Sequence, residues 1–303
     1  MADMKVTVAG VDFSNPLIAA SGTFGFGREY MEFYPLSTLG GISCKGITLH
    51  ERAGNPPPRI AETPGGMLNA VGLQNPGVDY FIENDLPWLK TQGTTIIANI
   101  AGNTYEDYCA MAEKLSDTDV DMLELNISCP NVKEGGVQFG TSCTGVEEIT
   151  KQVRAHCTKP LMVKLSPNVS DIGDISAAVE QGGADAISMI NTITGMRIDI
   201  RTRRPIIRNN TGGLSGPALL PVAVRMISQA YQRVKIPIVG MGGVSTWQDA
   251  VELMLAGSTA LQVGTAFFSN PYAPVEILKG LEQYWDENNI ASVTELTGKV
   301  QLW

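Results

Sequence analysis

The segment MLELNISCPNVKEGGVQFGTSCTGVEEITKQVRAHCTKPLMVKL, Met122–Leu165, contains the strand–helix–strand pattern that decides the fold. Met122–Ile127 and Leu161–Leu165 are short apolar runs, which are typical of strands buried on both faces. Val146–His156, between them, has the apolar spacing of an amphipathic helix. A strand, a helix and a second strand in this order predict one parallel β/α unit.

The same alternation extends along the chain in both directions. The eight predicted strands are Leu17–Ala20, Gly41–Lys45, Thr95–Ile100, Met122–Ile127, Leu161–Leu165, Ala186–Ile190, Ile236–Gly240 and Ala260–Val263. Further helices are predicted over Tyr105–Leu115, Ile172–Gln181, Pro217–Tyr231 and Thr246–Leu255. A chain of 303 residues fits a barrel of about 250 residues with insertions. We therefore predict an α/β fold, a (β/α)8 TIM barrel that forms one domain, residues 1–303.

The barrel is expected to carry additions at both ends. Lys5–Val8 and Val11–Phe13 predict an N-terminal hairpin across the barrel floor. Thr48–Asn75 and Asn191–Ser215 are rich in turn residues and predict long βα-loop insertions, a length typical of functional lids or partner surfaces. An open doubly wound sheet is the rival fold, but GTFGFG at Gly22–Gly27 lacks the GxGxxG spacing of that class.

Charge and composition limit the function. The net charge of −9 gives no electrostatic attraction to nucleic acid or to an anionic membrane. Five arginines in Arg197–Arg208 are interpreted either as a solvated loop or as a surface for a partner or an anionic group. The N-terminus has no signal-peptide core and no run reaches 18 apolar residues, so a cytoplasmic protein is expected.

The cysteines are expected to be thiols, because a cytoplasmic compartment is reducing. No CxxC spacing indicates a zinc or iron–sulfur site in this chain. Cys44, Cys109 and Cys157 are interpreted as small apolar residues. Cys143 is either an exposed loop thiol or a neighbour of the lid of the site. Cys129, which precedes a proline on a loop after a strand, is placed for chemistry.

The active site of such a barrel lies at the carboxyl ends of its strands. The residues predicted there are polar but include neither a pair of carboxylates nor a cluster of metal ligands, which argues against glycosidase and metal chemistry. They are Ser21, Gly22, Lys45, Gly46, Asn99, Asn126, Ser128, Cys129, Asn131, Lys164, Asn191, Thr192, Gly242, Gly243, Gly264 and Thr265.

Three features of this ring indicate an anionic, planar ligand. Gly242–Val244 and Gly264–Thr265 end the last two strands, where barrels often bind phosphate, although turn glycines explain such pairs equally well. Lys164 stands in an apolar strand and needs an anionic partner, such as a reduced flavin. A Schiff-base lysine or a snorkelling side chain is the alternative. Amides suit a ring with alternating N–H and C=O groups, and the candidates are Asn69, Asn126, Asn131 and Asn191.

These residues lie in motifs that resemble the dihydroorotate dehydrogenases of class 1, and most closely the class 1B catalytic subunit. The resemblance runs nearly end to end. Its motifs are KGITL (Lys45–Leu49), NAVGLQNPG (Asn69–Gly77), NISCPNVKEGG (Asn126–Gly136), KLSPN (Lys164–Asn168), INT (Ile190–Thr192), GGLSGPA (Gly212–Ala218), GMGGV and QVGTA. One departure is SCTG after FGT, where the family pattern has an acidic residue and a proline.

The resemblance implies FMN as cofactor and dihydroorotate as substrate. Cys129 is implied as the base that removes the proton from carbon 5, while the hydride from carbon 6 passes to N5 of FMN. The implied substrate-binding residues are Lys45, Asn69, Ala70, Val71, Gly72, Leu73, Asn126, Asn131, Asn191 and Thr192. The implied FMN-binding residues are Ser21, Gly22, Lys45, Gly46, Asn99, Asn126, Lys164, Ile190, Gly216, Gly242, Gly243, Gly264 and Thr265.

The resemblance also implies a partner. Class 1B enzymes pass electrons to NAD+ through an iron–sulfur flavoprotein subunit that carries FAD and a 2Fe-2S cluster, so a homodimer within a heterotetramer is expected. The alternatives are a fumarate-dependent class 1A enzyme, a related FMN-dependent dihydropyrimidine oxidoreductase, a Schiff-base aldolase that uses Lys164, and a binding barrel without activity.

Overall fold

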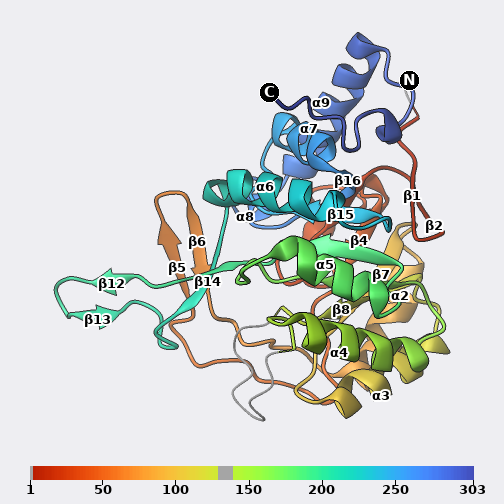
Figure 1. Ribbon diagram of the computed structural model, residues 1–303. Helices are drawn as coiled ribbons and strands as arrows, with labels where there is room; N and C mark the ends of the chain where they lie inside the picture. The colour runs from red at the N-terminus through yellow and green to blue at the C-terminus, as the bar shows by residue number, and fades with distance from the viewer. Residues whose placement is uncertain (1–2, 129–138) are drawn as a thin grey trace.

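The molecule is built around a closed barrel of eight parallel strands, with helices outside it (Figure 1). The computed structural model describes residues 3–128 and 139–303. The barrel strands, in their order around the barrel, are β3 (Leu17–Ala19), β4 (Gly41–Ser43), β7 (Thr95–Ile100), β8 (Met122–Asn126), β9 (Leu161–Lys164), β10 (Ala186–Met189), β15 (Ile238–Met241) and β16 (Ser258–Val263). All eight overlap the predicted strands, so the predicted barrel is confirmed.

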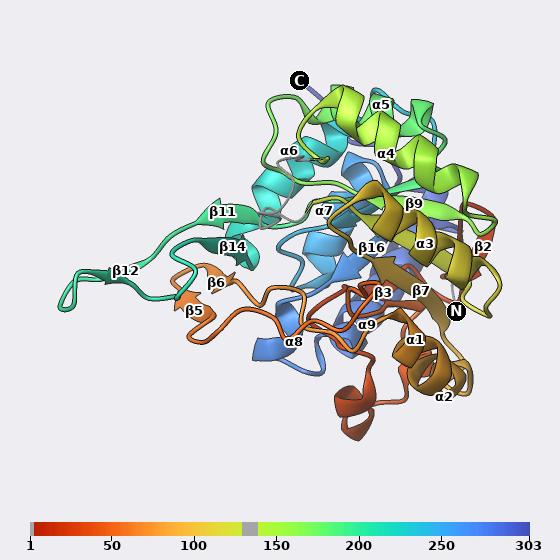
Figure 2. The ribbon, with the colours of Figure 1, turned by 90° about the horizontal axis from the view of Figure 1, so that it is seen from below.

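Helices surround the barrel wall on its outer side (Figure 2). The α-helices are α1 (Val78–Tyr80), α2 (Leu86–Lys90), α3 (Tyr105–Ser116), α4 (Cys143–Ala155), α5 (Ile172–Gln181), α6 (Leu220–Tyr231), α7 (Trp247–Ala256), α8 (Ala266–Ser269) and α9 (Ala273–Asn288). A short π-helix, η3 (Phe81–Asp85), joins α1 to α2. The 3-10 helices are η1 (Arg28–Glu32), η2 (Leu36–Thr38), η4 (Pro217–Leu219) and η5 (Val293–Glu295). Among the helices in the described ranges, none is both long and apolar enough to cross a bilayer.

Capping residues fix where the predicted helices begin and end. Thr246 and Asp249 form the predicted capping box at the start of α7, in which each side chain accepts from the other residue's backbone N–H. Gly257 ends that helix with a φ of 137°, a conformation that favours glycine. The helices α1, α2, α8 and α9 were not predicted. The first three are only three to five residues long, whereas α9 has 16 residues and was simply missed.

The predicted N-terminal hairpin is confirmed and covers one end of the barrel. β1 (Val6–Val8) pairs with β2 (Val11–Phe13) in antiparallel register. The Phe13 ring fills the space beside Gly41, the first residue of β4, and the Thr95 hydroxyl at the start of β7 donates to the Asp12 carbonyl at 3.1 Å. The hairpin therefore closes the amino ends of the strands, opposite the expected site.

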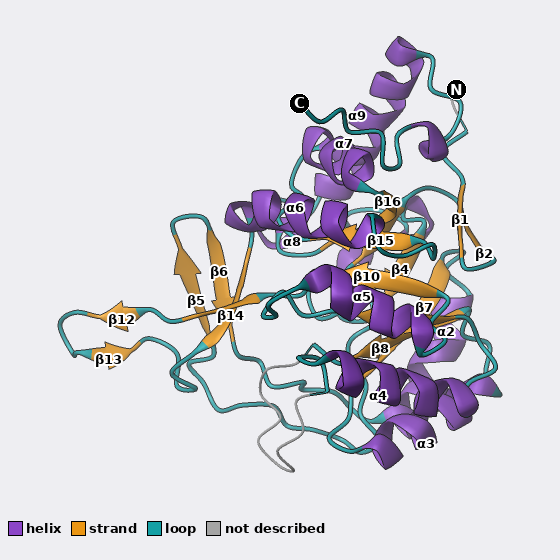
Figure 3. Ribbon diagram, in the orientation of Figure 1, coloured by secondary structure: helices purple, strands orange, loops and turns teal. Residues whose placement is uncertain are grey.

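The two long insertions were predicted as loops, but they contain strands that pair with each other (Figure 3). A four-stranded antiparallel sheet has the order β11 (Ile193–Gly195), β14 (Gly212–Ser215), β6 (Gly66–Asn69) and β5 (Ile60–Thr63). β12 (Ile198–Asp199) and β13 (Arg204–Pro205) form a hairpin that projects from the body in both views. All five arginines of Arg197–Arg208 are exposed, which fits both the solvated-loop interpretation and the partner-surface interpretation.

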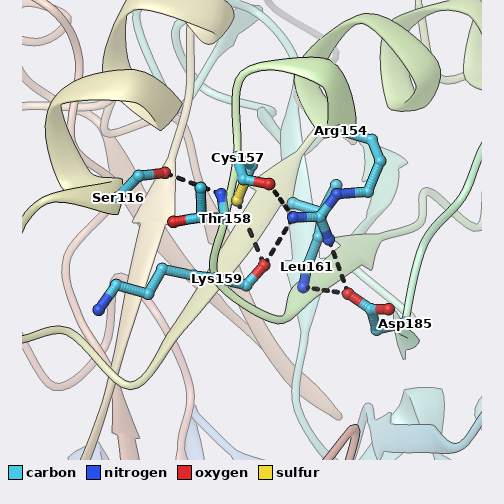
Figure 4. A network of polar contacts seen from close by, with 7 residues as sticks. All are labelled: Ser116, Arg154, Cys157, Thr158, Lys159, Leu161 and Asp185. Atoms are coloured by element: carbon cyan, nitrogen blue, oxygen red, sulfur yellow. Dashed lines mark hydrogen bonds and ion pairs between the residues drawn. The ribbon is translucent and has the colours of Figure 1, made fainter.

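A polar network ties helix ends to the amino ends of β9 and β10, again away from the site (Figure 4). Arg154 near the end of α4 contacts Asp185, which precedes β10, at 2.8 Å. The same Asp185 oxygen accepts the Leu161 N–H at 2.8 Å, and Arg154 donates to the Lys159 carbonyl at 2.9 Å. This network holds the α4–β9 connection against β10 at the amino ends of the strands, which is the end of the barrel opposite the expected site.

Candidate active site

A cavity of about 360 Å³ opens at the carboxyl ends of the barrel strands. It is lined by the last residues of β8 and β9, by residues at or just after the ends of β3, β4, β10, β15 and β16, and by residues of the antiparallel insertion sheet. Carboxyl ends of parallel strands meet at one edge of a barrel, which explains why segments far apart in sequence converge here. The cavity is the place where the predicted site residues should meet.

The structure brings almost all of the described candidates to this cavity. Those that line it are Ser21, Gly22, Lys45, Gly46, Asn69, Ala70, Val71, Gly72, Leu73, Asn126, Lys164, Ile190, Asn191, Thr192, Gly216, Gly242, Gly243, Gly264 and Thr265. Asn99 does not line it and instead lies behind Gly46, where an added Cβ would come within 3.0 Å of its Oδ1. Cys129 and Asn131 lie outside the described residues.

Several lining residues were missed by reasoning from sequence. They are Ala20, Thr23, Ile60, Met67, Gly213, Ser215, Leu219, Met241, Val244, Gln262, Ala266 and Phe268. Most carry no chemical signal in sequence, because they are apolar or small. Gln262 did carry one, since an amide in the apolar strand ALQV resembles Lys164 in its own strand.

The amide side chains are held by one another and by neighbouring backbone. Asn126 donates through Nδ2 to Asn99 Oδ1 at 3.3 Å, and its own Oδ1 accepts the Ser128 hydroxyl at 2.7 Å. Asn191 donates through Nδ2 to that same hydroxyl oxygen, and its Oδ1 accepts the Thr192 N–H at 2.8 Å. The result is a polar wall of the cavity formed by Asn126, Asn191 and Thr192, which Asn99 on β7 supports from behind through its hydrogen bond to Asn126.

Glycine turns form another side of the cavity. Gly242 and Gly243 follow β15 with φ of 123° and 84°, in the left-handed region that favours glycine. A Cβ on Gly243 would meet the Leu220 backbone N at 2.5 Å, so this turn packs closely against the start of α6. Exposed backbone near a helix start is the arrangement that binds phosphate groups in barrels.

Lys164 contributes a buried positive charge to the cavity. Its side chain ends β9 and only 4% of the residue is exposed. It lines the cavity, and its charge interacts with the buried Glu124 carboxylate, although the described residues give its ammonium group no direct hydrogen bond. A buried ammonium group whose own donors are unmet favours a ligand that presents an anionic or strongly accepting edge.

The other cysteines take the places expected of packing residues, with one exposed. Burial raises the pKa of Cys44, Cys109 and Cys157, which keeps these thiols neutral. Cys143 is exposed at the first residue of α4, not in a loop, and it does not line the cavity. Of the described thiols, none is therefore a candidate base.

The chain is similar to known proteins over nearly its whole length. A family model described as dihydroorotate dehydrogenase matches residues 3–285. A protein of Alkaliphilus oremlandii (strain OhILAs) is 56% identical over 298 residues, which cover 98% of this chain and 99% of that protein. A protein of Petrotoga mobilis (strain DSM 10674 / SJ95) is 51% identical over 298 residues, with the same coverage. Both are named dihydroorotate dehydrogenase B (NAD(+)), catalytic subunit.

Proposed function

We propose, from the premise that the chain belongs to the dihydroorotate dehydrogenase family, that it oxidises dihydroorotate to orotate in pyrimidine biosynthesis. The observation that carries the proposal is the meeting of Lys164 and four described amide or hydroxyl residues in one cavity: Asn69, Asn126, Asn191 and Thr192. A planar pyrimidine with alternating N–H and C=O groups needs such donors and acceptors. No metal ligand set is required for this reaction.

The cavity fits FMN, the cofactor of this family. Lys164 offers a buried charge to the pyrimidine edge of a flavin, and the close-packed turn of Gly242 and Gly243 with Gly264 and Thr265 suits the phosphate. We assign the remaining flavin contacts to Ser21, Gly22, Lys45, Gly46, Asn126, Ile190 and Gly216, with Asn99 acting from behind Gly46. When bound, FMN supplies a two-electron acceptor for a hydride.

The substrate is assigned to the side of the cavity formed by the insertions. Asn69 ends β6, and the segment Ala70–Leu73 that follows it also lines the cavity, as do Asn126 and Asn191. Lys45 lines the same cavity and is assigned to both ligands. Asn131 completes the proposed substrate set from sequence, outside the described residues.

Cys129 is the proposed base. In the oxidation a proton leaves carbon 5 and a hydride leaves carbon 6, so a carbon–carbon double bond forms and the substrate loses two electrons. Cys129 itself lies outside the described residues, but it is next in the chain after Ser128, whose hydroxyl joins the Asn126 and Asn191 side chains. A thiol is an effective base only when its thiolate is stabilised, and we assign that role to Lys45 and to N–H groups of the loop.

The electrons are proposed to reach NAD+ through a second subunit. The names of the relatives, dihydroorotate dehydrogenase B (NAD(+)), catalytic subunit, support a partner and NAD+ in preference to fumarate. We assign FAD and a 2Fe-2S cluster to that partner, in a heterotetramer built on a homodimer of this chain. Fumarate-dependent turnover by the isolated chain would contradict this assignment.

An anaerobic absorbance spectrum of the purified chain tests the proposal. Flavin bands are expected, and dihydroorotate should bleach them while orotate accumulates in equal amount. Bands that persist with dihydroorotate but bleach with another dihydropyrimidine would move the assignment to a related reductase. A chain that takes up no FMN, even when it is supplied, would refute the proposal.

A further inference from the structure

A carboxylate is buried inside the barrel, next to the candidate site but not in it. Glu124 lies on β8, two residues before Asn126, and is fully buried. It does not line the cavity. Burying a carboxylate is costly unless it is hydrogen-bonded and its charge is balanced, so its surroundings need an explanation.

Four strands supply hydrogen bonds to this carboxylate. Its Oε2 accepts the Ser43 hydroxyl at 2.5 Å and the Asn99 Nδ2 at 2.6 Å. Its Oε1 accepts the Ser188 hydroxyl at 2.6 Å and the Gln262 Nε2 at 2.7 Å. These partners come from β4, β7, β10 and β16, so one side chain joins strands around the barrel.

Charge balance comes from Lys164. Burial alone would raise the pKa of Glu124, but the Lys164 charge and the hydrogen bonds from Ser188, Ser43 and Asn99 outweigh it and lower the pKa below its ordinary value. Glu124 is therefore a carboxylate, which can only accept hydrogen bonds. Every amide bonded to it must turn its NH2 group toward it.

This requirement fixes where the amide oxygens point. Asn99 gives its NH2 to Glu124, and its Oδ1 accepts from Asn126 at 3.3 Å. Gln262 also gives its NH2 to Glu124, but its Oε1 is buried and has no hydrogen-bond partner among the described residues. Gln262 is 1% exposed and lines the cavity. A buried acceptor without a donor is costly, so it indicates a ligand that brings an N–H group.

We propose that Gln262 is a flavin-binding residue whose Oε1 accepts the N–H of the pyrimidine ring of FMN, and that Glu124 is the positioning residue that fixes this orientation. The inference rests on the proposed binding of FMN. It explains why a carboxylate lies below the cavity: an acceptor-only group is needed to prevent the Gln262 amide from turning its NH2 group toward the flavin. A neutral amide at position 124 would not impose that orientation.

The variants Gln262→Met and Glu124→Gln test the two roles, and Ser188→Ala is the matched control. Methionine keeps the length of glutamine but removes the acceptor. Glutamine at 124 removes the charge and brings an NH2 group against hydroxyl or amide donors. Ser188→Ala also removes one donor to Glu124 Oε1, but Ser188 does not line the cavity.

The measurements are the dissociation constant of FMN and the ¹⁵N chemical shift of N3 in FMN labelled at that atom. We expect Gln262→Met and Glu124→Gln to bind FMN roughly 10- to 100-fold more weakly and to move the N3 shift upfield of wild type, as a lost hydrogen bond requires. Ser188→Ala should keep the wild-type N3 shift. A purely structural network would lower thermal stability in all three variants but leave N3 unchanged.

The outcomes separate this inference from the proposed function. If the wild-type chain binds no FMN, the proposed function fails. If wild type binds FMN but Gln262→Met keeps its affinity and its N3 shift, the inference is overturned and the cofactor stands. Gln262→Met decides the question even if Glu124→Gln does not fold, because it leaves the carboxylate and its other three donors in place.

Discussion

Asn69 and Gly213 are directly opposite one another in adjacent antiparallel strands, although 144 residues separate them in the chain. The Asn69 Nδ2 donates to the Gly213 carbonyl at 3.5 Å, which is a long contact. Gly213 in turn leaves no room on its other side, because an added Cβ would meet the Thr192 hydroxyl oxygen at 2.0 Å. One glycine therefore sets the relative position of two proposed substrate-binding residues.

Gly213→Ala should impair substrate binding and not flavin binding. The new methyl group has to displace Thr192, and a misplacement of about 1 Å in a positioning residue costs up to about 100-fold in rate. We expect kcat/KM for dihydroorotate to fall roughly 10- to 100-fold while the flavin absorbance per protein is retained. Steady-state kinetics with a dye acceptor measure it.

The matched control is Gly195→Ala in the same sheet. There the added Cβ would meet the Leu68 Cδ2 at 3.0 Å, the end of a side chain that can move. Its kcat/KM should stay within about threefold of wild type if the effect at Gly213 acts through Thr192. Equal losses in both variants would show that general damage to the sheet, and not Thr192, is responsible.

The sequence predicts the barrel and most of the cavity, because β8 and β9 are apolar runs whose ends carry marked polar residues such as Asn126 and Lys164. It does not predict the insertion sheet. The β6 and β14 strands are four residues each, contain glycine, and pair over a separation that local patterns do not encode. Gln262 was missed for another reason: its role depends on Glu124, which becomes its neighbour only when the barrel closes.

Lys164→Met should weaken FMN binding. A hydrogen bond to a charged group contributes about 1.5–3 kcal/mol, which is roughly a 10- to 100-fold change in the dissociation constant. Lys114→Met is the control, because Lys114 contacts only Asp79 at the surface in the described structure and should not change FMN affinity. Titration of flavin fluorescence measures both. An unchanged FMN affinity in Lys164→Met would show that Lys164 does not bind the flavin. If borohydride trapped a substrate adduct on wild type but not on Lys164→Met, Lys164 would instead form a Schiff base.

Cys129→Ser should slow flavin reduction by dihydroorotate roughly 10²- to 10⁴-fold, the range for a lost general base. The rate of the variant should recover in part at high pH, since a hydroxyl is a weaker acid than a thiol. Anaerobic stopped-flow absorbance measures the reduction step without the electron acceptor. Cys143→Ser, at the exposed start of α4, should reduce at the wild-type rate. If dihydroorotate reduced the flavin of Cys129→Ser at the wild-type rate, another group would be the base that takes the proton from carbon 5.

Glu124 should make the free energy of unfolding depend on pH, and Glu124→Gln should remove that part of the dependence. Its pKa is lowered in the folded protein from an unfolded value of 4.5, so it stabilises the fold fully above pH 4.5 and loses that contribution as the pH falls through the lower folded value. Glu124→Gln cannot titrate. We expect it to be less stable than wild type at pH 7, with a difference in the free energy of unfolding that narrows as the pH drops below 4.5.

Urea denaturation measures this difference when wild type and Glu124→Gln are compared at a series of pH values and at the same FMN concentration. The contributions of the other carboxyl groups are the same in both proteins and cancel in the difference. Lys164→Met tests the same interaction from the side of the lysine. Loss of the Lys164 charge removes the largest influence that lowers the Glu124 pKa, so the folded pKa should rise toward its unfolded value or past it, and the loss of stability on acidification that Glu124 causes should shrink or reverse sign. A constant difference between wild type and Glu124→Gln at every pH would mean that the group at position 124 has the same pKa folded and unfolded, and that Lys164 and the four donors do not hold it as a carboxylate.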